Sequence, residues 1–135
     1  MEHHRGRLLD HVHLRVRDVD ASRRFYRAVT EALGIPFGRE SESSFSVDEL
    51  YVSDDGEPTA GVHLAFQAAD EAAVERFYEA GIAAGGRDNG RPGPRDYHPG
   101  YFAAYLFDPD GNNVEAVYHG PAERSAPSVV FTVDE

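Results

Sequence analysis

The spacing of apolar residues along the chain predicts a strand followed by a helix. In residues 11–17 every second residue is apolar, which is the period of a strand with one buried face. Apolar residues then recur at helical spacing, and Asp18 stands where an N-cap is expected. Gly34, followed by a proline two positions later, is expected to end this helix.

The same pattern returns further along the chain. Residues 63–86 align with residues 11–34 at an offset of 52 positions, and nine of the 24 aligned residues are identical. Agreement at this level without gaps predicts a duplicated unit. The Phe-Tyr pair within each helix is expected to pack that helix against a sheet. The most informative identical pairs are His11 and His63, Asp18 and Asp70, Phe25 and Phe77, and Tyr26 and Tyr78.

Short strands are expected after each helix. In the second copy, residues 101–107 and 112–118 flank an Asp-Pro-Asp-Gly turn, which predicts a hairpin. The preceding residues 85–100 are rich in Gly and Pro and are expected to form a loop over the mouth of a site. In the first copy, residues 44–53 are expected to hold two strands. Residues 120–135 are expected to be a tail or an added edge strand.

Together these elements predict an α+β fold in one domain spanning residues 1–135. Two tandem βαβββ modules are expected to form a curved mixed sheet, with a half-barrel cleft on one side and one main helix per module on the outside. Module 1 is expected to cover about residues 8–57 and module 2 about residues 60–120, with a C-terminal tail over residues 121–135.

Composition narrows the range of partners. The chain has 13 Lys and Arg against 24 Asp and Glu, for a net charge of −11. This balance repels phosphate backbones and anionic membrane surfaces, so neither nucleic acid nor a membrane is an expected partner. The chain has no cysteine, which excludes disulfides, a thiolate nucleophile and cysteine-ligated zinc. No apolar run is long enough for a signal peptide or a membrane span, so we expect a cytoplasmic protein.

Three residues form the candidate metal site. His11 and His63 occupy equivalent positions on the two opening strands, and both would project into one cleft if those strands lay side by side. Glu115, in the strand predicted over residues 112–118, supplies a carboxylate. Two imidazoles and one carboxylate on one side of an ion leave positions open for a substrate. These ligand types accept Fe, Mn, Zn, Ni or Co, and they do not select among them.

Further residues are candidates for supporting roles. His98 is predicted to act as an acid–base catalyst and Tyr101 to line the pocket as a catalytic residue, with Tyr105 on the same face. His13 is a candidate substrate contact or, with a register shift of two, a ligand. Arg15 is a candidate for a salt bridge or for holding an anionic substrate. The remaining expectations are that Asp108 and Asp110 serve the turn, and that His3, His4 and His119 are exposed.

The order of these motifs resembles the vicinal oxygen chelate superfamily, which includes glyoxalase I, extradiol dioxygenases, and fosfomycin- and bleomycin-resistance proteins. The resemblance covers about residues 8–120, and its most specific segment is DPDGNNVEAV. It implies that His11, His63 and Glu115 are the metal ligands. The fourth ligand of glyoxalase I, a Glu in the last strand of the first unit, has only the uncertain counterpart Glu49.

The resemblance implies a metal-dependent enzyme of the glyoxalase or dioxygenase type, a dioxygenase or lyase that chelates neighbouring oxygens of a small-molecule substrate. It also implies a homodimer, because many members build their cleft across two chains. The alternative is a metal-free protein of the bleomycin-resistance type that binds and sequesters a drug or metabolite. Reaction and substrate are left open, since one fold and one ligand set serve several chemistries.

Overall fold

The computed structural model describes residues 2–5, 7–125 and 128–133, with two helices and nine strands in those residues. In chain order the elements are β1 (Glu2–Arg5), β2 (Val12–Arg15), α1 (Val19–Ala32), β3 (Ser44–Val47), β4 (Leu50–Ser53), β5 (His63–Gln67), α2 (Glu71–Ala83), β6 (Arg87–Pro94), β7 (Phe102–Phe107), β8 (Asn113–Tyr118) and β9 (Val129–Thr132).

The two modules share one strand order. In module 2 the order is β5-β8-β7-β6, and in module 1 it is β2-β4-β3. In both, the opening strand pairs in parallel with the last strand, which pairs antiparallel with the strand before it. Residues 38–40 run beside β3 through backbone hydrogen bonds and take the place that β6 has in module 2. The predicted α+β fold with two repeated modules is therefore confirmed.

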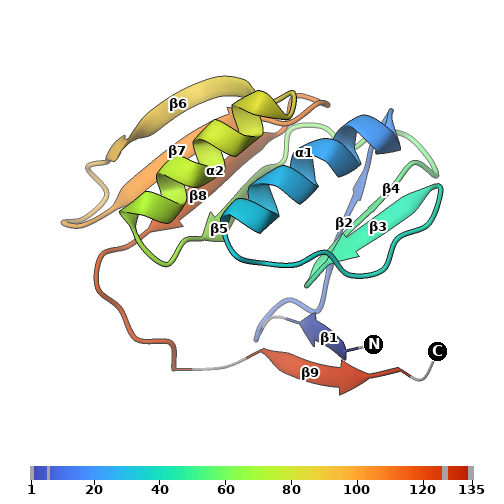
Figure 1. The fold of residues 1–135 in the computed structure, drawn as a ribbon, viewed down its shortest axis with the longest axis horizontal. Helices are drawn as coiled ribbons and strands as arrows, with labels where there is room; N and C mark the ends of the chain where they lie inside the picture. Colours follow the sequence, from blue (N-terminus) through green and yellow to red (C-terminus); the bar gives the residue numbers. More distant parts are fainter. Residues whose placement is uncertain (1, 6, 126–127, 134–135) are drawn as a thin grey trace.

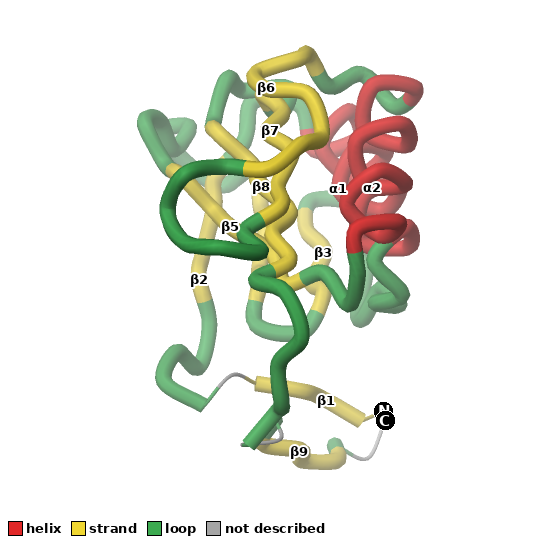
Figure 2. The backbone as a smooth tube through the Cα atoms, turned by 90° about the vertical axis from the view of Figure 1, so that its left-hand side faces the viewer, coloured by secondary structure: helices red, strands yellow, loops and turns green. Residues whose placement is uncertain are grey.

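Both helices lie side by side on one face of the sheets, as Figures 1 and 2 show from two directions. Each helix begins at its predicted cap, since Asp18 accepts hydrogen bonds from the backbone N–H groups of residues 20 and 21, and Asp70 accepts one from residue 73. Phe25, Tyr26 and Phe77 are fully buried between helix and sheet, which confirms the packing role of the Phe-Tyr pairs.

The Asp-Pro-Asp-Gly turn links module 2 to the helix of module 1. As predicted, Asp108 holds the turn, because its Oδ1 accepts hydrogen bonds from the backbone N–H groups of Asp110 and Asn112. Its Oδ2 accepts a 2.6 Å hydrogen bond from the hydroxyl of Tyr26 on α1. Burial, with the nearby charge of Asp108, raises the pKa of Tyr26 well above its usual value, so this hydroxyl remains a donor.

The loop prediction for residues 85–100 is wrong for its first part, because residues 87–94 form strand β6. This strand is at the edge of the sheet, so a proline there leaves no central pairing unmet. Its pairing with β7 shifts register between Asp88 and Gly90 and again between Gly90 and Gly93. The glycines and prolines that suggested a loop are thus the residues that an irregular edge strand tolerates.

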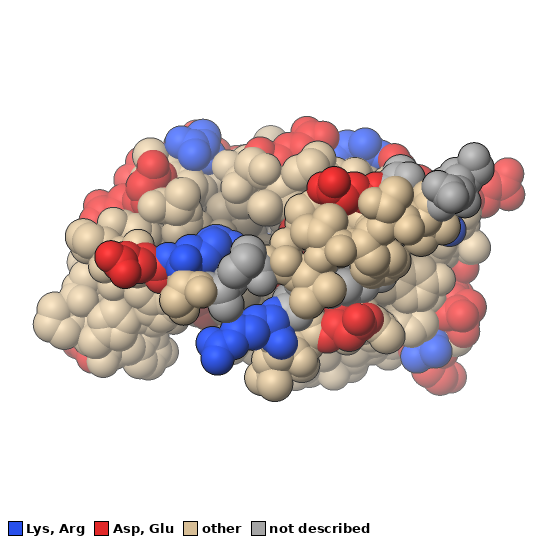
Figure 3. Space-filling model, turned by 90° about the horizontal axis from the view of Figure 1, so that it is seen from below, with Lys and Arg blue, Asp and Glu red and all other residues tan. Residues whose placement is uncertain are grey.

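Residues 129–132 form the added strand that was one of two expectations for the C-terminal segment. This strand, β9, pairs antiparallel with β1 in a separate two-stranded sheet and not with either module. Figure 1 shows the two-stranded sheet of β1 and β9 below the two modules. Seen from that side, the surface carries both acidic and basic residues separated by uncharged ones (Figure 3). No helix in the described part of the chain could cross a membrane.

The opening strands of the two modules do not pair with each other. Strand β2 is hydrogen-bonded to β4, and β5 is hydrogen-bonded to β8, so they belong to different sheets. The arrangement assumed for the two strand histidines, side by side on neighbouring strands, is therefore not the one observed within a chain.

Candidate metal and ligand site

Two of the three predicted ligands meet on the face of module 2 that lies opposite the helix. His63 begins β5, and Glu115 lies on β8 beside it, with Nε2 of His63 2.7 Å from Oε1 of Glu115. Oε2 of Glu115 accepts a 2.5 Å hydrogen bond from the hydroxyl of Tyr101. The period of two along β8 explains this placement, since the residues on either side of Glu115 face the core below α2.

The environment of Glu115 is unusual for an ionisable group. Its side chain is 2% exposed, whereas that of His63 is 52% exposed. Among the described residues, His63 is the one ion-pair partner of Glu115, and it carries a charge only when protonated. A carboxylate taken out of water is costly unless a cation or several donors compensate it. The pair thus combines a buried acceptor with an accessible imidazole.

Tyr101 is held by aromatic neighbours at the end of module 2. Its ring lies edge-on to the rings of His98 and His119, at 5.4 and 5.2 Å between centroids. These two histidines are joined by a hydrogen bond of 2.9 Å between Nε2 of His98 and Nδ1 of His119. Burial, together with the hydrogen bond to Glu115, raises the pKa of Tyr101. The Tyr101 hydroxyl therefore contacts the Glu115 carboxylate directly, whereas His98 contacts the Tyr101 ring.

His119 was expected only to be exposed, and its contact with His98 was not predicted. The two residues come from the loop before β7 and from the end of β8, so no local pattern in the sequence joins them. Gly100 permits the approach, because a side chain there would meet the backbone of His119 and Gly120. The sequence does contain one indication of this contact, because His98 precedes the first strand of the predicted hairpin and His119 follows its second strand.

Tyr105 lies directly across from Glu115 on β7. The guanidinium of Arg95 lies 5.2 Å from the centre of its ring, and it donates hydrogen bonds to the backbone carbonyls of residues 91, 93 and 94. Burial, with the charge of Glu115, raises the pKa of Tyr105. Tyr105 therefore shares the face of Glu115, as its alternation with Tyr101 predicted, and is held there by Arg95.

The third predicted ligand, His11, lies in module 1 just before β2. Its ring is exposed, and Nδ1 is 2.8 Å from Oδ1 of the neighbouring Asp10. Within one chain, no group of three or more His, Asp or Glu side chains in the described residues is arranged to hold a metal ion. A single chain thus brings together His63 and Glu115, while His11 is in the other module.

The register of the two sheets identifies the counterpart of Glu115 in module 1. On β8, Glu115 is the partner of Ala65, two residues after His63. On β4, the residue paired two positions after His11 is Tyr51, opposite His13. Tyr51 therefore occupies the position of Glu115, and Glu49, the candidate fourth ligand, precedes that position by two residues.

Neighbouring residues of module 1 form a hydrogen-bonded chain beside Tyr51. Nε2 of His13 is 2.7 Å from Oγ of Ser53, whose hydroxyl donates a 2.5 Å hydrogen bond to Asp55. This hydroxyl lowers the pKa of Asp55, and the guanidinium of Arg15 lies 3.3 Å from the same carboxylate. Of the two roles considered for Arg15, the structure therefore shows the salt bridge. His13 is engaged by Ser53 and Tyr51 within the chain.

Comparison with known proteins places this architecture in a family. Residues 8–116 match the family model described as Glyoxalase/Bleomycin resistance protein/Dioxygenase superfamily. The chain belongs to this superfamily. The match spans both modules, from the segment before β2 into β8, and so includes His11, His63 and Glu115. The resemblance inferred from the duplicated pattern and the Asp-Pro-Asp-Gly segment is thereby confirmed.

Solved structures of the superfamily share the fold. A glyoxalase/bleomycin resistance protein from Albidiferax ferrireducens is 33% identical, with a TM-score of 0.70 over 79% of this chain and 95% of that one. A glyoxalase-related enzyme from Fulvimarina pelagi is 20% identical, with a TM-score of 0.68 over 96% and 100% of the two chains. Lactoylglutathione lyase from Agrobacterium tumefaciens is 21% identical, with a TM-score of 0.60 over 83% and 93%. No curated protein matches the chain.

Proposed function

We propose that this superfamily member is a metal-dependent enzyme of the glyoxalase or dioxygenase type, acting on a small molecule. In this proposal, His63 and Glu115 of one copy bind a divalent ion together with His11 from module 1 of a second copy. The observation that carries the proposal is the buried Glu115 carboxylate, which has an accessible imidazole beside it and no permanent cation among the described residues.

The residues present suit such an ion. Imidazole nitrogen and carboxylate oxygen are common ligands of Fe, Mn, Zn, Ni and Co, and those of His63 and Glu115 already lie 2.7 Å apart. A divalent ion would also neutralise the buried carboxylate. The contact between Asp10 and Nδ1 of His11 supports the third ligand, because an Nδ1–H donated to that carboxylate leaves Nε2 with a lone pair.

A bound ion would supply Lewis-acid stabilisation of negative charge on neighbouring substrate oxygens. The chain's own side chains have separate tasks. Tyr101 donates to Oε2 of Glu115 and so fixes the carboxylate in one orientation. His98 and His119 pack edge-on against the Tyr101 ring, and Tyr105 lies across from Glu115 on β7. Both ring nitrogens of His98 already have partners, His119 and the carbonyl of Pro99. His98 would therefore have to break its hydrogen bond to His119 before Nε2 could exchange a proton with a substrate.

Metal content and affinity test the proposal directly. We expect protein purified without a chelator to retain a divalent ion, measured by elemental analysis. His63→Ala and His11→Ala should each weaken metal binding by about tenfold or more, as measured by calorimetry. His4→Ala, at another partly exposed histidine, is the matched control and should bind as the wild type does. Unchanged affinity in His11→Ala would show that His11 is not a ligand.

A mixing experiment tests whether the site spans two copies. On its own, each of the variants His11→Ala and Glu115→Gln should bind metal about tenfold or more weakly than the wild type. In a mixed dimer, module 1 of the Glu115→Gln chain faces the intact module 2 of the His11→Ala chain, so one complete site is regenerated. Restored binding on mixing and re-forming the dimers is the expected result. Failure to restore it, with mixed dimers present, would contradict a site built across the two chains.

A metal-free ligand-binding protein is the second candidate, and one observation favours it. Both oxygens of Glu115 already have partners within a single chain, His63 and Tyr101. A carboxylate satisfied in this way needs no ion. Wild-type protein that neither retains an ion nor binds one on titration, yet binds small organic molecules at this face, would support this function over the enzyme.

A further inference from the structure

We propose that His98 and His119 bind a divalent transition-metal ion of the class that prefers imidazole, such as Zn²⁺, Ni²⁺ or Cu²⁺. The two ligands come from the loop before β7 and from the residue after β8, so the ion would tie the start of β7 to the end of β8. This site is separate from His63 and Glu115. The inference therefore goes beyond the proposed function and does not rest on it.

The first observation is the distance between the two imidazoles. Nε2 of His98 and Nδ1 of His119 lie 2.9 Å apart, and the two rings are nearly parallel, with 17° between their planes. Metal–nitrogen bonds of about 2.1 Å that meet at about 90–110° place two ligand nitrogens about 3.0–3.4 Å apart. The pair therefore has to open by about 0.5 Å at most to take an ion between these nitrogens.

The second observation concerns the hydrogen that lies between the rings. Nδ1 of His98 is 2.9 Å from the carbonyl oxygen of Pro99, which can only accept, so this nitrogen carries a hydrogen. In the neutral ring, Nε2 of His98 then has a lone pair and accepts a hydrogen bond from Nδ1 of His119. Neutral imidazole has two tautomers. Transfer of this one hydrogen to Nε2 of His119 leaves two lone pairs facing the space between the rings, where an ion can accept both.

The third observation is the exposure and the charge around the pair. Both histidine side chains are exposed, so an ion can enter with water in its remaining positions. A hollow of about 400 Å³ beside His98 is also lined by Glu71 and Asp96, whose carboxylates favour a cation. The one arginine in this lining, Arg95, is held by three backbone carbonyls and by the ring of Tyr105. No third His, Asp or Glu in the described residues completes the site, which therefore has two protein ligands.

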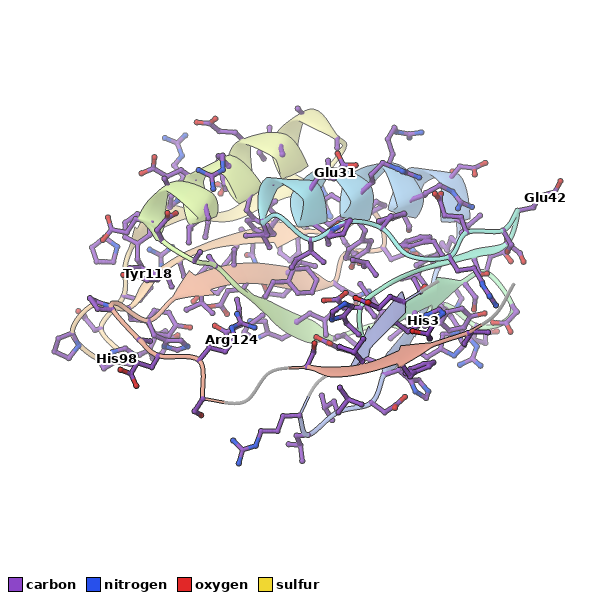
Figure 4. The ribbon with its side chains drawn as sticks, turned by 60° about the horizontal axis from the view of Figure 1, so that its bottom comes forward. His3, Glu31, Glu42, His98, Tyr118 and Arg124 are labelled. Carbon is purple, nitrogen blue, oxygen red and sulfur yellow. The ribbon has the colours of Figure 1, made fainter. Side chains whose placement is uncertain are left out.

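The place of the pair in the fold gives the ion a structural task. Figure 4 shows His98 and Tyr118 at the same end of module 2, away from His3. The ring of Tyr101 lies edge-on to both histidines, and its hydroxyl donates to Glu115. An ion that holds the two histidines together would therefore also hold Tyr101 in its position at the carboxylate.

The test uses full-length His63→Ala freed of metal with a chelating resin, because this variant lacks a ligand of the proposed cleft site. The probes are Zn²⁺ and Mg²⁺, titrated by calorimetry and followed through the histidine ring signals in NMR spectra. We expect one Zn²⁺ per chain with ring shifts at His98 and His119, and no binding of Mg²⁺, which prefers oxygen ligands. Absence of Zn²⁺ binding, equal binding of Mg²⁺, or ring shifts confined to other histidines would overturn the proposal.

Two substitutions distinguish a pair of ligands from a single one. In the His63→Ala background, His98→Ala and His119→Ala should each weaken Zn²⁺ binding by about tenfold or more. His4→Ala removes another partly exposed histidine, which lies beside a carboxylate, and should bind Zn²⁺ as the background does. Loss of affinity in only one of the two variants would refute an ion shared by both rings. Since every sample lacks His63, none of these outcomes depends on whether the proposed function is correct.

Discussion

The hydrogen bond from Tyr26 to Asp108 offers a direct test of how the two modules are joined. Both side chains are buried, and the 2.6 Å bond links α1 of module 1 to the hairpin turn of module 2. In Tyr26→Phe the ring would still fill its space, but Oδ2 of Asp108 would keep only a contact of 3.5 Å with Asn112. Loss of a hydrogen bond to a buried charged group costs about 2 kcal/mol.

This cost converts into a measurable shift in melting temperature. For 135 residues, the entropy of unfolding is about 280 cal/mol/K, so about 2 kcal/mol lowers the midpoint by about 7 °C. Urea unfolding followed by circular dichroism should show the same loss of free energy with an unchanged m-value. Tyr97→Phe, at an exposed tyrosine, is the control and should unfold as the wild type does. A Tyr26→Phe midpoint within about 1 °C of the wild type would refute the reasoning.

Two further substitutions test the packing and charge described here. Glu40→Gln should cost about 0.5 kcal/mol at pH 7, because Arg27 holds the pKa of Glu40 below its usual value; the loss should vanish as the pH falls through that lowered pKa, and a loss that persists in acid would exclude the ion pair as its cause. Gly81→Ala would bring a Cβ within 2.2 Å of a methyl group of Leu106. Overpacking of about 1–3 kcal/mol should outweigh a helix-propensity gain of about 1 kcal/mol, so a more stable variant in thermal unfolding would contradict this packing.

Local patterns were sufficient to predict much of the fold. The caps Asp18 and Asp70, the Phe-Tyr pairs and the hairpin turn depend on residues close together in sequence, and all are found where they were predicted. Strand β6 was missed because its glycines and prolines carry the composition of a loop, and only its place at a sheet edge makes that composition acceptable.

The candidate site was less accessible from sequence. The offset between the modules is 52 at the opening histidines but 64 at Tyr51 and Glu115, because both the connection between helix and hairpin and the hairpin turn itself are longer in module 2. The constant-offset alignment therefore could not pair these two residues. His63 and Glu115 lie in contact because their strands pair directly. The place of His11 depends on how the modules are arranged, which no local pattern encodes.

The pairing of β1 with β9 brings the two ends of the described chain together, with Glu2 and Thr132 as register partners. A short covalent linker there would convert the chain into a ring without moving either module. Such a ring could be opened instead in the connector before β5, where Gly61 has a φ of 73° that suits a turn. The fold would then begin with module 2 and end with module 1, and the strand pairing within each module would be unchanged.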